Sequence, residues 1–156
     1  KVYAVLLNGL TPGGSAGLDA LRDRLAERGF TKVYVAQVVH AGWLEREMAR
    51  VCADEPGARF VVVGYDLGCV AAKDIAERMT AAGVPVDALV YLDPAGVKTG
   101  AVVSRTVVVR SGGATTPVPH TETVYVPSAG HFDLPDHPSL RRTGWTDAWL
   151  EGAAFE

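Results

Sequence analysis

Short, continuous apolar runs alternate along this chain with longer segments in which apolar residues recur at helical spacing. Continuous runs are typical of parallel strands, because a sheet covered on both faces buries every side chain of its strands. The runs predict strands at residues 2–7, 33–39, 60–63, 86–92, 105–110 and 122–126. Turn-forming pairs such as Asn8-Gly9 and Asp93-Pro94 mark where strands end.

The segments between the runs predict helices. Leu18, Leu21 and Leu25 share one helical face ahead of Gly29. Further helices are predicted over residues 43–51 and 67–82, and at the end of the tail 138–152, where Trp145 and Trp149 lie. Parallel neighbours need a helix-length connection, so this alternation predicts a single α/β domain over residues 1–156. Its architecture is a three-layer sandwich around a doubly wound, mostly parallel sheet of about six strands.

The composition narrows the classes of partner. The 156 residues include 15 basic and 18 acidic side chains, and no run of like charge attracts nucleic acid or an anionic membrane. No apolar stretch approaches the roughly 20 residues needed to span a bilayer. We therefore expect a soluble protein whose partner is a small-molecule substrate or ligand, with no nucleic acid and no membrane.

The two cysteines, Cys52 and Cys69, have neither metal-ligand nor Cys-x-x-Cys spacing. A disulfide framework is not expected, and a reducing, cytoplasmic compartment is the default. The N-terminal residues also lack the ordered regions of a signal peptide. Cys69 lies in a predicted helix, where a buried, inert thiol is expected rather than a nucleophile.

The most specific motif follows the third predicted strand, where residues 64–68 read Gly-Tyr-Asp-Leu-Gly. A turn between a strand and a helix is the place of a nucleophile elbow, whose central residue is strained. Side chains two positions to either side of that residue would collide with the neighbouring strand and helix, which explains Gly64 and Gly68. The motif therefore presents Asp66 at the carboxyl edge of the sheet, where sites of open α/β folds lie.

Two further strand-end residues complete a recognisable order. Asp93 ends the fourth strand, and Gly130-His131-Phe132 follows the last one. The order nucleophile, acid and histidine, over nearly the whole chain, resembles the α/β-hydrolase superfamily. Most members carry serine where this chain has Asp66. A carboxylate takes that place in the haloalkane dehalogenase and epoxide hydrolase branches, which this chain resembles at the nucleophile position but not in their tyrosine pair or tryptophan.

That resemblance implies the roles of the candidate site residues. Asp66 would attack carbon to form an alkyl-enzyme ester, His131 would activate the water that hydrolyses it, and Asp93 would orient the imidazole. The strand after Asp93 is followed by Ser111-Gly112 and supplies no carboxylate, so the hydrolase interpretation relies on Asp93 as the orienting acid.

The resemblance also suggests how substrate would be held. Backbone amides of Leu67, and of Leu10 or Thr11, would form an oxyanion pocket beside the elbow helix. Tyr65 is expected to line the cleft, with Trp43, Tyr91 and His40 as further candidates. The two branches bury substrate under a helical cap inserted after the residue equivalent to Asp93, and only residues 94–104 are available for one here.

Each of these residues also has a possible role without catalysis. Asp66 is also suited to cap the following helix, His131 to bond within its own turn, and Asp93-Pro94 to form a turn. The chain would then be a catalytically inactive hydrolase fold that binds a small molecule or a protein. A flavodoxin-like or nucleotide-binding domain is disfavoured, because residues 11–14 lack a phosphate-binding fingerprint.

No cofactor and no metal is predicted. The acidic and histidine residues near His131, which are Asp133, Asp136 and His137, lack a helical frame for ligation. An uncapped core would expose the apolar rim of its cleft, and a homodimer that covers this rim is one expectation.

Overall fold

The computed structural model describes residues 1–9, 16–97, 103, 105–112 and 121–138. Their framework is one six-stranded sheet in which each neighbouring pair is parallel, in the order β2-β1-β3-β4-β5-β6. The strands are β1 (Val2–Asn8), β2 (Lys32–Gln37), β3 (Arg59–Tyr65), β4 (Val86–Leu92), β5 (Thr106–Ser111) and β6 (Glu122–Val126). The predicted α/β class and parallel sheet are thus confirmed.

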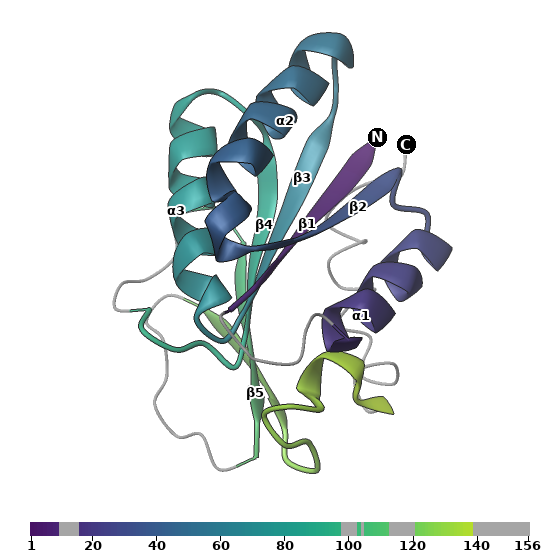
Figure 1. Ribbon diagram of the computed structural model, residues 1–156, viewed down its shortest axis with the longest axis vertical. Helices are drawn as coiled ribbons and strands as arrows, with labels where there is room; N and C mark the ends of the chain where they lie inside the picture. The colour runs from purple at the N-terminus through teal and green to yellow at the C-terminus, as the bar shows by residue number, and fades with distance from the viewer. Residues whose placement is uncertain (10–15, 98–102, 104, 113–120, 139–156) are drawn as a thin grey trace.

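Helices cover both faces of this sheet. The helix α1 (Ala16–Glu27) lies on one face, while α2 (Ala41–Asp54) and α3 (Gly68–Ala81) lie together on the other (Figure 1). Each face has its own core, and alternate residues of a strand enter alternate cores: Val61 and Val63 pack with α1, whereas Phe60 and Val62 pack with α2 and α3. This double burial explains why the central strands are continuous apolar runs.

The strand order reverses between β1 and β3. The chain passes from β1 outward to β2 and then returns to the other side of β1 to begin β3. A crevice opens at such a reversal because the two flanking connections leave in opposite directions. The carboxyl ends of β1 and β3 are Asn8 and Tyr65, so Asp66 lies beside the reversal.

One predicted strand ends earlier than expected, and one predicted helix is not tested. The strand expected over residues 33–39 ends at Gln37, and the chain turns through the short 3-10 helix Val38–His40. β2 is an edge strand whose one buried residue is Tyr34, so the apolar Val39 is not held in the sheet and is 71% exposed. The helix expected at the end of the tail 138–152, with Trp145 and Trp149, lies outside the described residues.

A further 3-10 helix, Leu134–Asp136, follows the loop that carries His131. Leu134 is fully buried in the core beneath α1, which ties the loop after β6 to the body of the fold. Within the described ranges, no helix is long and apolar enough to cross a membrane.

Candidate active site

The turn between β3 and α3 has the strained geometry of a nucleophile elbow. Asp66 has a φ of 55°, in the left-handed region that costs a residue with a Cβ roughly 1–2 kcal/mol. Its N–H donates to the carbonyl of Leu92, and its carbonyl accepts from the N–H of Cys69. These bonds fix the turn from both sides and hold the carboxylate above the sheet edge.

The two glycines of the motif are there because the turn brings backbone against backbone. A Cβ built on Gly64 would lie 2.5 Å from Cα of Cys69, and one built on Gly68 would lie 2.2 Å from the carbonyl oxygen of Leu7. Neither distance is possible for real atoms. The steric requirement expected from the motif is therefore present at both positions.

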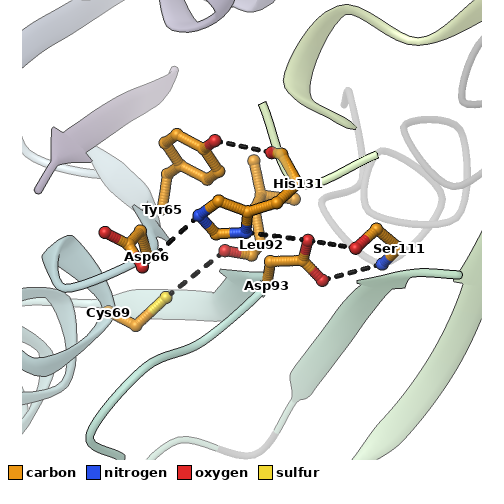
Figure 2. Close-up of polar contacts among 7 residues, drawn as sticks. All are labelled: Tyr65, Asp66, Cys69, Leu92, Asp93, Ser111 and His131. Atoms are coloured by element: carbon orange, nitrogen blue, oxygen red, sulfur yellow. Dashed lines mark hydrogen bonds and ion pairs between the residues drawn. The ribbon is translucent and has the colours of Figure 1, made fainter. Parts of the chain in front are cut away.

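His131 lies between the two candidate carboxylates (Figure 2). Its Nδ1 is 3.0 Å from Oδ2 of Asp93, and its Nε2 is 3.4 Å from Oδ1 of Asp66. An ionised carboxylate only accepts hydrogen bonds, so the ring donates its Nδ1–H to Asp93. When the ring is neutral, its Nε2 carries a lone pair, so it makes no hydrogen bond to Asp66 and can accept a proton.

Asp93 is held more firmly than any other group in the site. Its side chain is 7% exposed, the backbone N–H of Ser111 donates to Oδ1 at 2.7 Å, and the Ser111 hydroxyl donates to Oδ2. Asp93 also has a positive φ, of 43°, and its own N–H donates to Val109. The acid therefore comes from the end of β4, and the end of β5, where the sequence has no carboxylate, supplies its hydrogen-bond donors.

Ser111 is a residue that sequence reasoning placed only in a loop. Its involvement depends on the pairing of β4 with β5, which sets Leu92 opposite Val109 and brings Asp93 level with the end of β5. The available signal was a hydroxyl-bearing residue at the strand end where a carboxylate was sought.

Tyr65 does not have the predicted place on the cleft wall. Its ring is buried beneath His131, stacked on the imidazole with centroids 5.2 Å apart. Its hydroxyl donates to the backbone carbonyl of His131 at 2.6 Å. Burial, with the nearby carboxylates of Asp66, Asp93 and Asp133, raises the pKa of Tyr65 to about 12. The phenol is therefore a neutral donor that anchors the loop of residues 127–133, which carries His131 and is called the histidine loop below.

The other aromatic candidates also lie away from the triad of Asp66, His131 and Asp93. Tyr91 is fully buried under α3, so its expected place in an open cleft is wrong. Trp43 is half-exposed on α2 and packs edge-on against Tyr34, with centroids 6.1 Å apart. His40 lines a separate pocket of about 250 Å³ at the ends of β1 and β2, with Asn8, Val35, Ala36 and Gln37.

The triad opens into a pocket of about 260 Å³. Its walls are formed by Asp66, Asp93, Pro94, Ala95, Arg110, Ser111 and His131. The side chains of Asp66 and His131 are 24% and 34% exposed, so solvent reaches both of them. The pocket is large enough for a small organic molecule and contains one basic side chain, Arg110, that sequence reasoning did not single out.

The expected oxyanion pocket is described only on the side of Leu67. The chain at Gly9 passes close to the elbow, since a Cβ there would lie 3.1 Å from the backbone N of Leu67 and 3.2 Å from Oδ2 of Asp66. The amide of Leu67 therefore starts α3 directly beside the Asp66 carboxylate. Leu10 and Thr11, the alternative second donors, lie outside the described residues.

The alternative that Asp66 merely caps α3 lacks its defining contact. Leu67 is the residue at the N-cap of α3, and in the described part of the chain the Asp66 carboxylate makes no hydrogen bond to the first turn of that helix. The contact that the structure records for this carboxylate is with His131.

Cys69 is buried, as the sequence predicted. Burial raises the pKa of its thiol well above the usual value of 9.0, and the thiol lies 3.7 Å from the carbonyl oxygen of Leu92. Among the residues that the structure describes, no three histidine, cysteine or acidic side chains gather closely enough to hold a metal ion.

No protein-family model and no curated protein matches the sequence. Solved structures do resemble it. The α/β hydrolase enzyme MGS-MChE2, from a metagenome of lagoon sediments at Mar Chica, Morocco, matches with a TM-score of 0.69 and 16% identity over 98% of this chain and 92% of that one. The NocB thioesterase domain, solved as a covalent complex with a fluorophosphonate nocardicin G analog, gives 0.64 and 17% over 97% and 95%.

XC6422 from Xanthomonas campestris, described as an α/β serine hydrolase without lid, gives a TM-score of 0.64 and 16% identity over 97% of this chain and 80% of that one. At such low identities these likenesses establish the fold and nothing finer. The chain is thus an α/β-hydrolase-fold protein, with aspartate at the elbow position.

Proposed function

We propose that this protein is a hydrolase that cleaves a small organic substrate through a covalent ester on Asp66. The observation that carries the proposal is the placement of one imidazole between two carboxylates. One of these, Asp93, is fixed by two bonds from Ser111, and the other, Asp66, is presented by a strained elbow.

The first step uses the Asp66 carboxylate as the nucleophile. One oxygen attacks an electrophilic carbon, a carbon–oxygen bond forms, and the leaving group departs with the electron pair of the bond that breaks. A carboxylate is already anionic near neutral pH, so this attack needs no general base. The N-terminus of α3, which begins just beyond Asp66, favours a negative charge at this position.

The second step uses His131. A water molecule bound near Nε2 gives its proton to the imidazole and attacks the carbonyl carbon of the Asp66 ester. Asp93 stabilises the imidazolium through Nδ1, and the amide of Leu67 stabilises the oxyanion that develops. The tetrahedral intermediate then expels the product alkoxide, which takes the proton back from His131, and the carboxylic acid left at Asp66 releases its proton to solvent to restore the carboxylate.

The other nucleophiles near the site are committed elsewhere. The Ser111 hydroxyl donates to Asp93, and the Cys69 thiol is buried with its pKa raised. The description of XC6422 as lidless supports a hydrolase core of this fold that works without a cap. The covalent complex of the NocB thioesterase domain supports covalent chemistry on the same fold.

One observation favours the inactive alternative, a binding module for a small molecule or a protein. Asp66 is 24% exposed at an open pocket, and a hydrated carboxylate is a weaker nucleophile than one in a water-excluded site. The same pocket would then bind a ligand without transforming it.

The test is a turnover screen with short esters, epoxides and haloalkanes on the parent protein, Asp66→Ala, Asp66→Ser and His131→Ala. Asp133→Asn is the matched control, because it removes an exposed carboxylate of the histidine loop that is outside the triad. We expect turnover in the parent and in Asp133→Asn, and its loss in Asp66→Ala. A silent parent beside an Asp66→Ser variant that gains esterase turnover would contradict the proposal and favour the binding module.

A further inference from the structure

Arg110 lines the same pocket as Asp66 and His131 and has no charged partner there. In the described part of the chain, no carboxylate lies within ion-pair distance of its guanidinium. Its Nε is buried and makes no hydrogen bond. A buried donor without an acceptor is costly, and native proteins retain few of them. An arginine whose Nε lacks an acceptor, at a candidate active site, therefore leaves a place for an anionic group.

The position of Arg110 follows from the alternation of β5. Val108 packs in the core beneath α2 and α3, so the residue two positions later faces the same side of the sheet, toward the start of α3. The charge of Arg110 also acts on the first turn of α3, where Cys69 lies. Burial raises the pKa of the Cys69 thiol, Asp66 and Asp93 raise it further, and Arg110 lowers it. Thus the guanidinium and the nucleophile share one electrostatic environment.

We propose that Arg110 binds the carboxylate of a small anionic substrate and so places the neighbouring carbon before Asp66; this rests on the function proposed above. A guanidinium is planar and offers two parallel N–H donors, which matches a carboxylate. A monoanion fits better than a phosphate dianion, because Asp66 and Asp93 already supply two negative charges to the pocket. The volume of about 260 Å³ suits a substrate with a few carbon atoms beyond its carboxylate.

Arg110 would also reduce the electrostatic repulsion between Asp66 and an anionic substrate. The Asp66 carboxylate would repel a substrate carboxylate attached to the carbon that it must attack. A cation on the substrate's carboxylate removes this repulsion. The Asp66 oxygen then displaces the leaving group from that carbon, the leaving group departs with its electron pair, and hydrolysis of the ester gives a hydroxy acid.

The test compares two probes of nearly equal shape, 2-chloropropionate and its neutral amide. Both are incubated with His131→Ala protein, in which the ester on Asp66 accumulates, and the labelling rate is read from intact mass and from the peptide that contains Asp66. We expect Arg110→Met to slow labelling by the carboxylate about tenfold or more and to leave the amide rate unchanged. Arg110→Lys should retain part of the carboxylate rate, and the exposed Arg46→Met is the matched control.

Equal slowing of both probes, or no slowing of either, overturns the proposal, because a merely structural Arg110 would not distinguish them. If neither probe labels Asp66 while Arg110 is intact, the covalent mechanism has failed. Anion binding is then measured separately, as the change in Tm caused by unreactive propionate. A rise in Tm by propionate in the parent but not in Arg110→Met then supports the anion site alone. If propionate changes the Tm of the parent and of Arg110→Met equally, the anion site is overturned.

Discussion

Asp66 and Asp93 are the two non-glycine residues with positive φ in the part of the chain that the structure describes. Both are acids, both follow a strand directly, and both contact the same imidazole. Backbone strain of this kind persists where surrounding bonds enforce it, and it concentrates at functional sites. At the scale of single residues, the molecule therefore places its strain at the two carboxylates of the triad.

The hydroxyl of Ser111 is predicted to support catalysis indirectly, by holding Asp93 in place, without contacting the substrate. Ser111→Ala removes the donor to Oδ2 of Asp93 and leaves the backbone donor to Oδ1. A looser Asp93 orients the imidazole less well, so we expect kcat to fall about tenfold, a part of the 10²–10⁴ that general base catalysis contributes. KM should change little, and Ser111→Thr should restore kcat. An unchanged kcat in Ser111→Ala would show that Asp93 is held without this hydroxyl.

The buried thiol of Cys69 is expected to make the free energy of unfolding depend on pH. Burial raises its pKa in the folded state, so the neutral thiol stabilises the fold below its usual pKa of 9.0, and this contribution is lost as the pH rises above that value. In a Cys52→Ser background, we expect the free energy of unfolding to fall more between pH 8 and 10 than it does in Cys52→Ser/Cys69→Ala. Equal pH dependence in both proteins would mean that Cys69 ionises freely in the fold.

At the scale of elements, the elbow is a close contact between α3 and β1. Gly68→Ala places a Cβ 2.2 Å from the carbonyl oxygen of Leu7, so a strand or a helix must shift, and overpacking of this kind costs about 1–3 kcal/mol. Gly42→Ala is the matched control in α2, where the nearest atom is 3.7 Å away, and it should stabilise the helix by about 0.5–1 kcal/mol. Urea unfolding measures both, and equal effects would contradict the contact.

The sequence predicted the central strands well because they are buried on both faces. β1 and β3 are nearly all buried, so their apolar runs have few polar interruptions. β2 lies at the edge of the sheet, where the apolar pattern no longer reports burial, and its predicted end was wrong by two residues. The side of the sheet that each residue faces also cannot be read from a continuous run. Tyr65 and Tyr91 were misplaced for this reason.

The triad itself was predictable because parallel strands bring their carboxyl ends to one edge. Asp66, Asp93 and His131 each follow a strand, and that placement needs only the order of elements. Ser111 and Arg110 were missed because their positions depend on how β4 and β5 are aligned. No local pattern in the sequence encodes that register.

At the scale of the whole molecule, the sheet order and the site belong together. The reversal between β1 and β3 opens the edge of the sheet at Asp66, and β4, β5 and the loop after β6 then bring the acid, its supporting serine and the histidine to the same edge. The pocket that results is small and open. Such a pocket fits the small substrate that we propose.

The most direct test of the central claim is a single turnover in water enriched in ¹⁸O, with protein in excess over any substrate that the screen identifies. In the proposed mechanism water attacks the carbonyl carbon of the Asp66 ester, while the product keeps an oxygen that came from Asp66. We therefore expect the heavy oxygen in the Asp66 peptide and an unlabelled product. Heavy oxygen in the product, with none in the Asp66 peptide, would contradict the account, because water would then have attacked the substrate directly.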